Sequence, residues 1–410
     1  PGTKCGKCGG GPDQLEKEKD IVDVWFESGV SWLAMAARGA DHADIDLYLE
    51  GSDQHRGWFH SSLLIGVGTR GRAPYEQVIT HGFTVDGQGR KISKSMGNDV
   101  DTKKLIDNYG AEIVRLWVSM VDYRDDMPFS DEMIKRVAEA YRKVRNTCRY
   151  LLSNLYDFDP AADAVPERQL QEIDRYALAR HRQVVRRVRE AYAGYEFHVV
   201  YHQLVQYCAA DLSSFYLDVL KDRLYCDAAD GPRRRSAQTV LNRVARDLAL
   251  LLAPVLPFTT DEIWPLIPGA QGSVHVAVFP EAEAAEEAVV DRWAALLEAR
   301  AVVTKALEEA RAGKQIAASL EARVEVRGPA AALAPLRAHE EESTVFPGNL
   351  ANLFIVSKVD LAEAEGPLAV GVGPAPGRKC ERCWTYSENV GRLPVHPAVC
   401  ERCAAVLERR

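Results

Sequence analysis

The segment 87–98 carries two lysines and two serines within five residues, and we refer to it as the lysine loop. These residues are Lys91, Ser93, Lys94 and Ser95. Glycines flank them on both sides and let the backbone bend close to a ligand. Two ammonium groups three residues apart can bind a polyphosphate and neutralise charge on a leaving pyrophosphate. A short motif of this kind is by itself more often a solvated basic loop, so the neighbouring residues decide.

A second polar run lies upstream, where an apolar stretch ends and a helical pattern begins. It contains Glu50, Gly51, Asp53, Gln54 and Trp58. A strand that ends in polar residues before a helix is typical of the ligand-binding rim of a parallel sheet. Glu50 can accept from an ammonium and Asp53 from ribose hydroxyls. Each residue alone is equally compatible with a satisfied polar contact, and Asp53 with a helix N-cap.

Four cysteines near the end of the chain have the spacing of a metal site. They are Cys380, Cys383, Cys400 and Cys403, arranged as two Cys-x-x-Cys pairs. Each pair can form a knuckle with two thiolates directed at one ion, and two knuckles complete a tetrahedral zinc site with Zn–S distances of about 2.3 Å. Such a site is closed, so we predict one structural Zn²⁺ that supplies most of the folding free energy of this segment.

The other five cysteines carry weaker signals. Cys5 and Cys8 form a third pair, which is half a site, and a second zinc there stays open. Cys148 and Cys208 lie in helical patterns and are expected to be small buried hydrophobic residues. Nothing in the sequence marks Cys226 as reactive.

An α/β unit over residues 1–125 is expected to position the two polar runs, because short apolar runs alternate there with helical patterns. Residues 46–51 and 77–83 are predicted strands, and the second leads into the lysine loop. Residues 58–67 form the predicted helix between them.

From Ser130 the pattern changes to long amphipathic helices, which predict a helical bundle over residues 126–280. The predicted helical segments are 131–157, 168–193, 197–224 and 233–253. Arginines recur along two of these helical segments. This pattern is compatible with either a solvated helix face or contact with RNA. The arginines are Arg182, Arg186, Arg187, Arg189 and Arg233 to Arg235.

Two smaller modules are predicted after the bundle. An Ala/Glu-rich tract at 281–288 indicates a linker, and a helix at 289–312 with strand-like alternation at 320–326 suggests an α+β module over 281–365. Glycines and prolines between 366 and 377 indicate a second linker, which opens the zinc-binding module over 366–410.

The composition is that of a globular protein of several domains, with 410 residues, 47% hydrophobic and 27% charged. A net charge of −8 argues against indiscriminate coating of nucleic acid but leaves room for a local basic face. The apolar run at 248–253 is too short to cross a bilayer, and no signal peptide is visible, so we expect a cytoplasmic protein without a membrane partner.

In this order the motifs resemble the C-terminal half of the class I aminoacyl-tRNA synthetases, and within them the bacterial isoleucyl enzymes. The matching blocks are residues 23–29, 48–59, 91–95, 252–259, 313–322 and 383–384. The resemblance covers nearly the whole chain. It implies half of a Rossmann-type catalytic domain, then an all-α anticodon-binding bundle, a small α+β junction module and a zinc ribbon-like module.

The resemblance implies roles for the lysine loop and for the metal site. Lys91 and Lys94, with their two serines, correspond to the mobile Lys-Met-Ser-Lys-Ser loop that stabilises ATP, with Ile92 in place of the methionine. The four C-terminal cysteines correspond to zinc ligands. The implied reaction activates isoleucine with ATP to the adenylate and transfers it to tRNA(Ile), and Mg²⁺ accompanies the ATP.

The polar run 50–58 corresponds to the pocket for the aminoacyl-adenylate. Glu50 binds the adenylate in this comparison, Asp53 and Gln54 line the pocket beside Gly51, and Trp58 is a wall of the isoleucine side-chain site.

Two elements of the family do not occur in this sequence: the His-x-Gly-His element that binds ATP phosphates, and the editing domain needed because one methylene discriminates poorly. We therefore expect a C-terminal part of an enzyme that is monomeric at full length, and a chain that forms no adenylate by itself. The alternatives are a sister enzyme for valine or leucine, and a non-catalytic tRNA-binding module.

A further hypothesis concerns the anticodon. It assigns a basic face to the arginines of segments 180–190 and 233–246, with Arg378, Lys379, Arg382 and Arg402 beside them. Binding to such a face would weaken steeply with salt.

Overall fold

The structure is a computed structural model that describes residues 2–36, 45–93, 96–341 and 346–409. Lys94 and Ser95 of the lysine loop therefore lie outside the described residues. The chain divides into two compact units. Unit 1 consists of residues 1–100 and 121–130, and unit 2 of residues 101–120 and 131–410.

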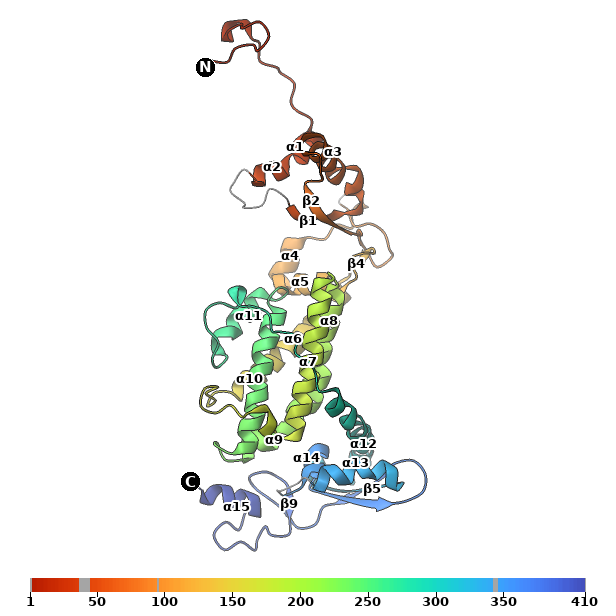
Figure 1. Ribbon diagram of the computed structural model, residues 1–410. Coiled ribbons are helices and arrows are strands. Elements are labelled where there is room, and N and C mark those ends of the chain that lie inside the picture. Colours follow the sequence, from red (N-terminus) through yellow and green to blue (C-terminus); the bar gives the residue numbers. More distant parts are fainter. Residues whose placement is uncertain (1, 37–44, 94–95, 342–345, 410) are drawn as a thin grey trace. The chain divides into compact units, whose positions relative to one another are not determined.

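A two-stranded parallel sheet forms the centre of unit 1 (Figure 1). Its strands are β1 (Ile45–Gly51) and β2 (Tyr75–His81), so both predicted strands are confirmed. Between them come the 3-10 turn η2 (Ser52–Arg56) and helix α3 (Trp58–Arg70), which confirms the predicted helix. Helix α1 (Val24–Gly29) packs against α3 and is followed by α2 (Ser31–Ala36). Near the start of the chain lies the 3-10 turn η1 (Pro12–Gln14).

A second, very short parallel pair holds the base of the lysine loop. It joins β3 (Thr84–Val85) to β4 (Met127–Pro128). Just before β3, Gly82 passes so close to this segment that a Cβ atom there would lie 2.3 Å from the carbonyl oxygen of Asp125. Only glycine permits this approach, which lets two segments more than forty residues apart meet at one place.

Unit 2 is mainly helical. It begins with α4 (Thr102–Tyr109) and α5 (Ala111–Met120), and continues with α6 (Asp131–Ser153), η4 (Glu167–Gln169), α7 (Glu172–Ala193), α8 (Phe197–Gln206), α9 (Leu217–Cys226), α10 (Pro232–Leu252), α11 (Pro257–Ile263), η6 (Trp264–Leu266) and η7 (Val274–Val276). The four predicted amphipathic segments are confirmed as helices. The segment 197–224 is not one continuous α-helix, because a π-helix, η5 (Tyr207–Tyr216), lies between α8 and α9.

The α+β module contains helix α12 (Glu287–Ala312) and the turn η8 (Ser319–Glu321). Its three-stranded sheet has the order β6-β5-β7, with β5 (Ala322–Gly328) parallel to β6 (Lys358–Glu363) and antiparallel to β7 (Ala369–Pro374). Along the chain, helices α13 (Ala330–Glu341) and α14 (Asn349–Phe354) follow β5 and precede β6. The predicted linker was wrong over residues 371–374, because these glycine-containing residues pair with residues 322–325 of β5.

The last module contains the strand pair β8 (Arg378–Lys379) and β9 (Tyr386–Ser387) and the helix α15 (Glu401–Glu408). Little regular structure surrounds these elements, so its core depends on the cysteines. Over the described ranges, the chain has no helix that combines the length and the apolar character needed to span a bilayer.

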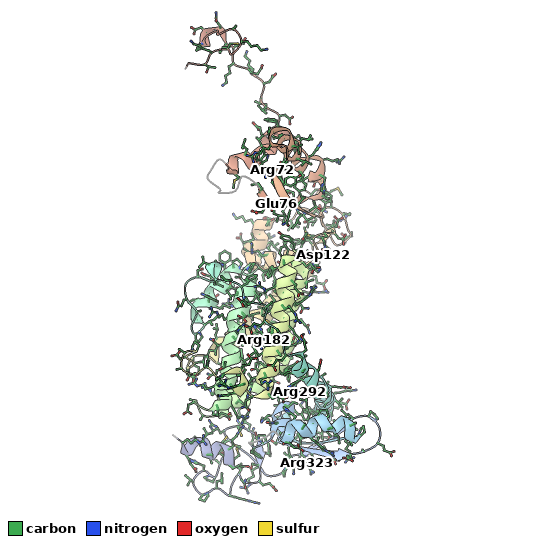
Figure 2. The ribbon with its side chains drawn as sticks, in the orientation of Figure 1. Arg72, Glu76, Asp122, Arg182, Arg292 and Arg323 are labelled. Carbon is green, nitrogen blue, oxygen red and sulfur yellow. The ribbon has the colours of Figure 1, made fainter. Side chains whose placement is uncertain are left out.

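The Ala/Glu-rich tract before α12 is an irregular segment that binds to α7 by ion pairs. Arg175 contacts Glu286 at 2.8 Å, and Arg182 contacts Glu283 at 2.8 Å. This acidic strap (residues 281–287) therefore neutralises one face of α7, where Figure 2 marks Arg182.

Candidate functional site

The two polar runs of unit 1 follow the carboxyl ends of neighbouring parallel strands. The register pairs Glu50 with Thr80 and Gly51 with His81, so β1 and β2 end side by side. The run 50–58 leaves the sheet after β1, and the lysine loop follows β2 and β3. This edge is where open parallel sheets bind ligands.

Trp58 is held as a rigid wall at the start of α3. Its ring stacks on Tyr48 with 4.1 Å between ring centroids and an interplanar angle of 11°. Its indole Nε1 donates to the carbonyl of Ser28 at 2.9 Å and to the hydroxyl of Ser31 at 3.2 Å. The block 23–29 and the block 48–59 are thus joined through this one side chain.

In the polar run, the side-chain amide of Gln54 is engaged within the protein, whereas, in the described part of the chain, the carboxylates of Glu50 and Asp53 are largely free. Gln54 Oε1 accepts from the backbone N–H of Trp58 at 3.0 Å, so it satisfies the first amide of α3. Asp53 is not a helix N-cap, and its carboxylate has no hydrogen-bond partner among the described residues. Glu50 is also exposed and accepts only a 3.3 Å bond from the adjacent Gly51 amide. Both carboxylates are available to a ligand.

Asp86 and Asn98 organise the lysine loop, and the sequence analysis missed both. Asp86 accepts from the backbone and side chain of Arg90 at 3.0 and 2.9 Å. These hydrogen bonds hold the pKa of its carboxyl well below its ordinary value of 3.8. Asn98 accepts from the amide of Ser93 at 3.0 Å and donates to the carbonyl of Lys91 at 3.2 Å. The turn-forming sequence Asp-Gly-Gln-Gly was the available signal for Asp86.

Lys91 has a defined position within the lysine loop. Its backbone forms a bridge with Val85, and its ammonium lies 3.8 Å from the centre of the Phe83 ring. The side chain is exposed, so the ring supports the cation without removing it from water. Lys94 and Ser95 are outside the described residues, and Ser93 is partly buried.

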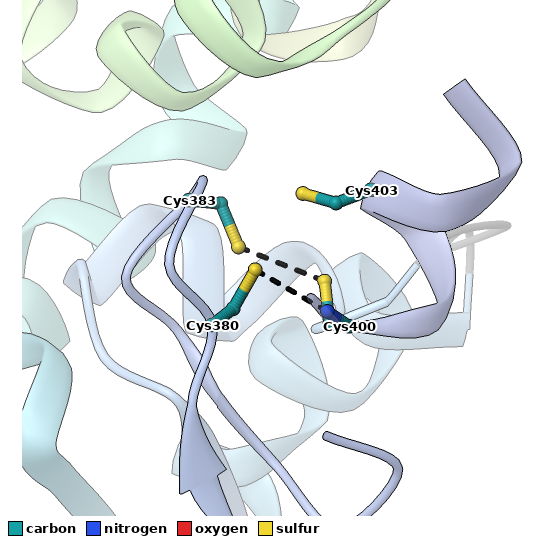
Figure 3. Close-up of side chains that lie close together, drawn as sticks. All are labelled: Cys380, Cys383, Cys400 and Cys403. Atoms are coloured by element: carbon teal, nitrogen blue, oxygen red, sulfur yellow. Dashed lines mark hydrogen bonds between the residues drawn. The ribbon is translucent and has the colours of Figure 1, made fainter. Parts of the chain in front are cut away.

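The four C-terminal cysteines converge in unit 2, as Figure 3 shows. Their sulfur atoms lie within 4.8 Å of one another, and all four residues are buried. Cys380 and Cys383 come from the turn before β9, and Cys400 and Cys403 from the start of α15. The backbone amide of Cys400 donates to Cys380 Sγ at 3.2 Å.

This arrangement fits one structural Zn²⁺. Four buried sulfurs at this separation can surround a single ion, and a closed four-sulfur set suits zinc rather than magnesium or calcium. Zinc binds cysteine in its deprotonated form, so the four sulfurs would hold the ion as thiolates. No open coordination position is implied, so the site stabilises the module and performs no reaction.

The remaining five cysteines lie in three places: in the bundle, near the start of the chain, and beside the zinc ligands. Cys148 and Cys208 are buried in the bundle, as predicted, and burial raises the pKa of Cys148 to about 12. Cys5 and Cys8 lie in an exposed turn, and no third potential ligand joins them within the described ranges. Cys226 packs in the same buried cluster as the four zinc ligands, which the sequence did not indicate.

The arginines assigned to a basic face are largely engaged within the protein, which weakens that hypothesis. On α7, Arg182 contacts Glu167 at 2.6 Å and Arg186 contacts Glu287 at 3.2 Å. On α10, Arg234 contacts Asp157 at 2.6 Å and is itself buried. Arg402 pairs with Asp222 at 2.6 Å. Most of the carboxylates that face these arginines come from segments distant in the sequence, so many charges of the stripes are paired within the protein.

Three families match successive parts of the chain. Residues 5–130 match the family described as tRNA synthetases class I (I, L, M and V). Residues 174–326 match the anticodon-binding domain of tRNA ligase, and residues 377–406 match a zinc finger found in FPG and IleRS. The last match coincides with the four-cysteine site.

Curated relatives agree with these matches. The chain is 50% identical to an isoleucine–tRNA ligase of Geobacter sulfurreducens and 47% identical to one of Moorella thermoacetica, over 100% of its length in both cases. It spans 45% of the length of each. Among solved structures, a LeuRS from Agrobacterium radiobacter K84, in a ternary complex with tRNA and LeuAMS, matches 70% of this chain and 35% of that chain, with a TM-score of 0.55 and 20% identity. This match supports the fold.

Proposed function

Because this chain belongs to the class I tRNA synthetases, we propose that it is part of an enzyme that joins isoleucine to tRNA(Ile). The observation that carries the proposal is the 50% identity to an isoleucine–tRNA ligase along the whole chain. The anticodon-binding match and the zinc finger accompany it in the order expected for such an enzyme. A cytoplasmic location follows from the same proposal, as does a monomer at full length.

In this proposal the lysine loop binds the polyphosphate of ATP. Lys91 neutralises charge that builds on the β- and γ-phosphates, and Lys94 acts in the same way three residues later. Asp86 and Asn98 hold the loop in a shape that presents Lys91 to solvent. Ser93 and Ser95 supply hydroxyl groups near the phosphates.

The polar run 50–58 binds the amino acid and the adenylate. The exposed carboxylate of Glu50 accepts from the ammonium of isoleucine, and that of Asp53 accepts from ribose hydroxyls. Gly51 keeps room for the Asp53 side chain, since a Cβ there would lie 2.7 Å from Asp53 Oδ1. Trp58 and Gln54 form the fixed side of the pocket.

The reaction needs no side-chain nucleophile. The carboxylate of isoleucine attacks the α-phosphate of ATP, pyrophosphate leaves, and a ribose hydroxyl of tRNA then displaces AMP from the adenylate. The protein positions the reactants and stabilises the departing charge, and Mg²⁺ arrives with ATP.

Isoleucine-dependent exchange of pyrophosphate into ATP tests the proposal. We expect exchange from a protein that contains this chain within a sequence of its relatives' length, with isoleucine preferred over valine and leucine. A preference for valine or leucine would replace isoleucine in the proposal by that amino acid.

The 410-residue chain by itself is the second sample in this experiment. We expect it to bind tRNA, measured by filter retention, and to give no exchange. Robust isoleucine-dependent exchange by the chain alone would contradict the expected dependence on further segments. Binding of tRNA without exchange in either sample would favour a non-catalytic tRNA-binding module.

A further inference from the structure

The two Cys-x-x-Cys pairs of the zinc module carry an arginine at the same place, directly before the second cysteine. These are Arg382 in the first pair and Arg402 in the second. In the structure both side chains reach the C-terminal part of α9 in the helical bundle. This part of the helix is more than 150 residues away in sequence.

Arg382 connects a zinc ligand to the end of α9. Its Nη1 donates to the backbone carbonyl of Cys226, the last residue of the helix. The same nitrogen lies 3.6 Å from Cys403 Sγ. In return, Cys226 Sγ lies 3.9 Å from the carbonyl oxygen of Arg382. A single guanidinium thus caps a helix C-terminus and donates to a metal ligand.

Arg402 makes the second connection one turn earlier on α9. Its two terminal nitrogens both bind the carboxylate of Asp222, one of them at 2.6 Å. The arginine side chain is 8% exposed and the aspartate 24%. A buried bidentate pair of this kind fixes both distance and orientation.

Two pockets lie next to these contacts. Cavities of about 410 and 460 Å³ flank the junction, one beside Arg402 and the other beside Arg382 and Asp222. The two arginines add polar contacts to those of the buried side chains at this junction. Between them lies the small buried cluster that contains Cys226 and the four zinc ligands.

We propose that Arg382 and Arg402 couple zinc binding to attachment of the module on α9, so that Asp222 and Cys226 of the bundle tune the affinity of the metal site. Zn²⁺ with four thiolates leaves two excess negative charges in a buried place. The two guanidiniums lie beside these charges and are themselves held in place by α9. Groups that orient metal ligands typically change metal affinity by about 10–100-fold when lost.

Asp222→Asn in the 410-residue chain tests the coupling from the bundle side. It keeps the shape of the side chain but removes the negative charge that Arg402 binds through both terminal nitrogens. We expect the zinc dissociation constant, measured by competition with a chromophoric chelator, to rise about tenfold. Asp218→Asn is the matched control, because Asp218 lies one turn earlier on α9 and pairs with the exposed Lys221. It should leave the dissociation constant within about twofold.

Hydrogen exchange of the unmodified chain tests the coupling from the metal side and requires no variant. Removal of zinc by the chelator should accelerate exchange of residues 222–228 about tenfold, while the centre of α10 stays protected. Arg402→Lys, which keeps the charge but cannot bind both carboxylate oxygens, should weaken zinc as Asp222→Asn does.

Equal zinc affinity in Asp222→Asn and Asp218→Asn, or unchanged exchange of residues 222–228 without zinc, would overturn the proposal. Neither measurement involves tRNA charging, so the outcome is independent of the proposed function.

Discussion

The lysine loop and the four-cysteine site are both short motifs with regular spacing, yet they are built in opposite ways. The described part of the loop presents Lys91 to solvent, and short-range contacts hold the loop, from Asp86 just before it to Arg90 and from Asn98 to Lys91. The cysteine site buries its sulfurs and ties them to a helix in another module. The loop is thus local and open, whereas the metal site is closed and depends on distant residues.

Under the function proposed above, the difference follows from what each group has to bind. A loop that binds ATP must admit and release a large anion on every turnover, so its cations stay in water until the ligand arrives. A structural metal stays in place, and a dry four-sulfur site holds it best. Solvent exposure is therefore required for the lysines of the loop and unfavourable for the sulfurs of the metal site.

Loss of a zinc ligand should have the largest effect. Cys400→Ser removes one of four sulfurs, and zinc binding in such modules contributes on the order of 10 kcal/mol to folding. We expect loss of zinc and rapid hydrogen exchange throughout residues 377–409, with α10 unchanged. Retention of one zinc per chain with a protected module would show that the site does not depend on all four sulfurs.

Replacement of Lys91 should be the next largest effect, and it should leave the fold intact. In an enzyme of full length, Lys91→Ala should slow pyrophosphate exchange by about 10²–10³-fold, because one charge on the leaving group is no longer neutralised. Thermal unfolding should not change, since the side chain is exposed. Lys91→Arg keeps the charge and should slow exchange less than Lys91→Ala does. If both variants slowed exchange equally, the compact ammonium group itself would be required.

Replacement of Asn98, which holds the lysine loop in shape, should have a smaller effect. Asn98→Ala removes the bonds to Ser93 and Lys91, each worth about 1 kcal/mol. We expect about a tenfold loss in kcat/KM for ATP in the exchange assay, with the KM for isoleucine unchanged. Gln88→Ala, on the exposed side of the same turn, serves as the control and should behave as the unmodified enzyme.

Acid should give the smallest effect, confined to the loop. The pKa of Asp86 is depressed in the folded protein, so its stabilising bonds persist above about pH 3.8 and are lost as the pH falls through the lower folded value. Exchange at the amides of Gln88 and Arg90, corrected for intrinsic rates, should accelerate over that range. Asp86→Asn should abolish this pH dependence; a persistent one would assign it to another group.

Much of the local structure was predictable. The strand 46–51, the helix after residue 58 and the long helices of the bundle are confirmed because periodicity reports directly on which face is buried. The four cysteines were predictable since backbone geometry alone directs both sulfurs of a knuckle to one point. The wrong linker at 371–374 shows the limit, because glycines in a strand resemble a linker until a partner strand is present.

The arginine stripes show the same limit for function. Their spacing could not distinguish an RNA face from a face that is paired within the protein. Glu283 pairs with Arg182 and Asp157 pairs with Arg234, and these carboxylates lie 101 and 77 residues away. The role of Asp86 was hidden for a different reason, since an aspartate in a turn is common and only its hydrogen bonds reveal it.

The sequence by itself determined which chemical groups this protein offers: a paired-lysine loop, a polar strand end and a four-cysteine site, since each depends on residue type and short spacing. The tertiary structure decided which charges are left for ligands and which are paired within the protein. It also brought Arg382 and Arg402 to α9. The physical reason is that spacing constrains only neighbours along the backbone, whereas ion pairs and burial depend on which surfaces the folded chain brings together.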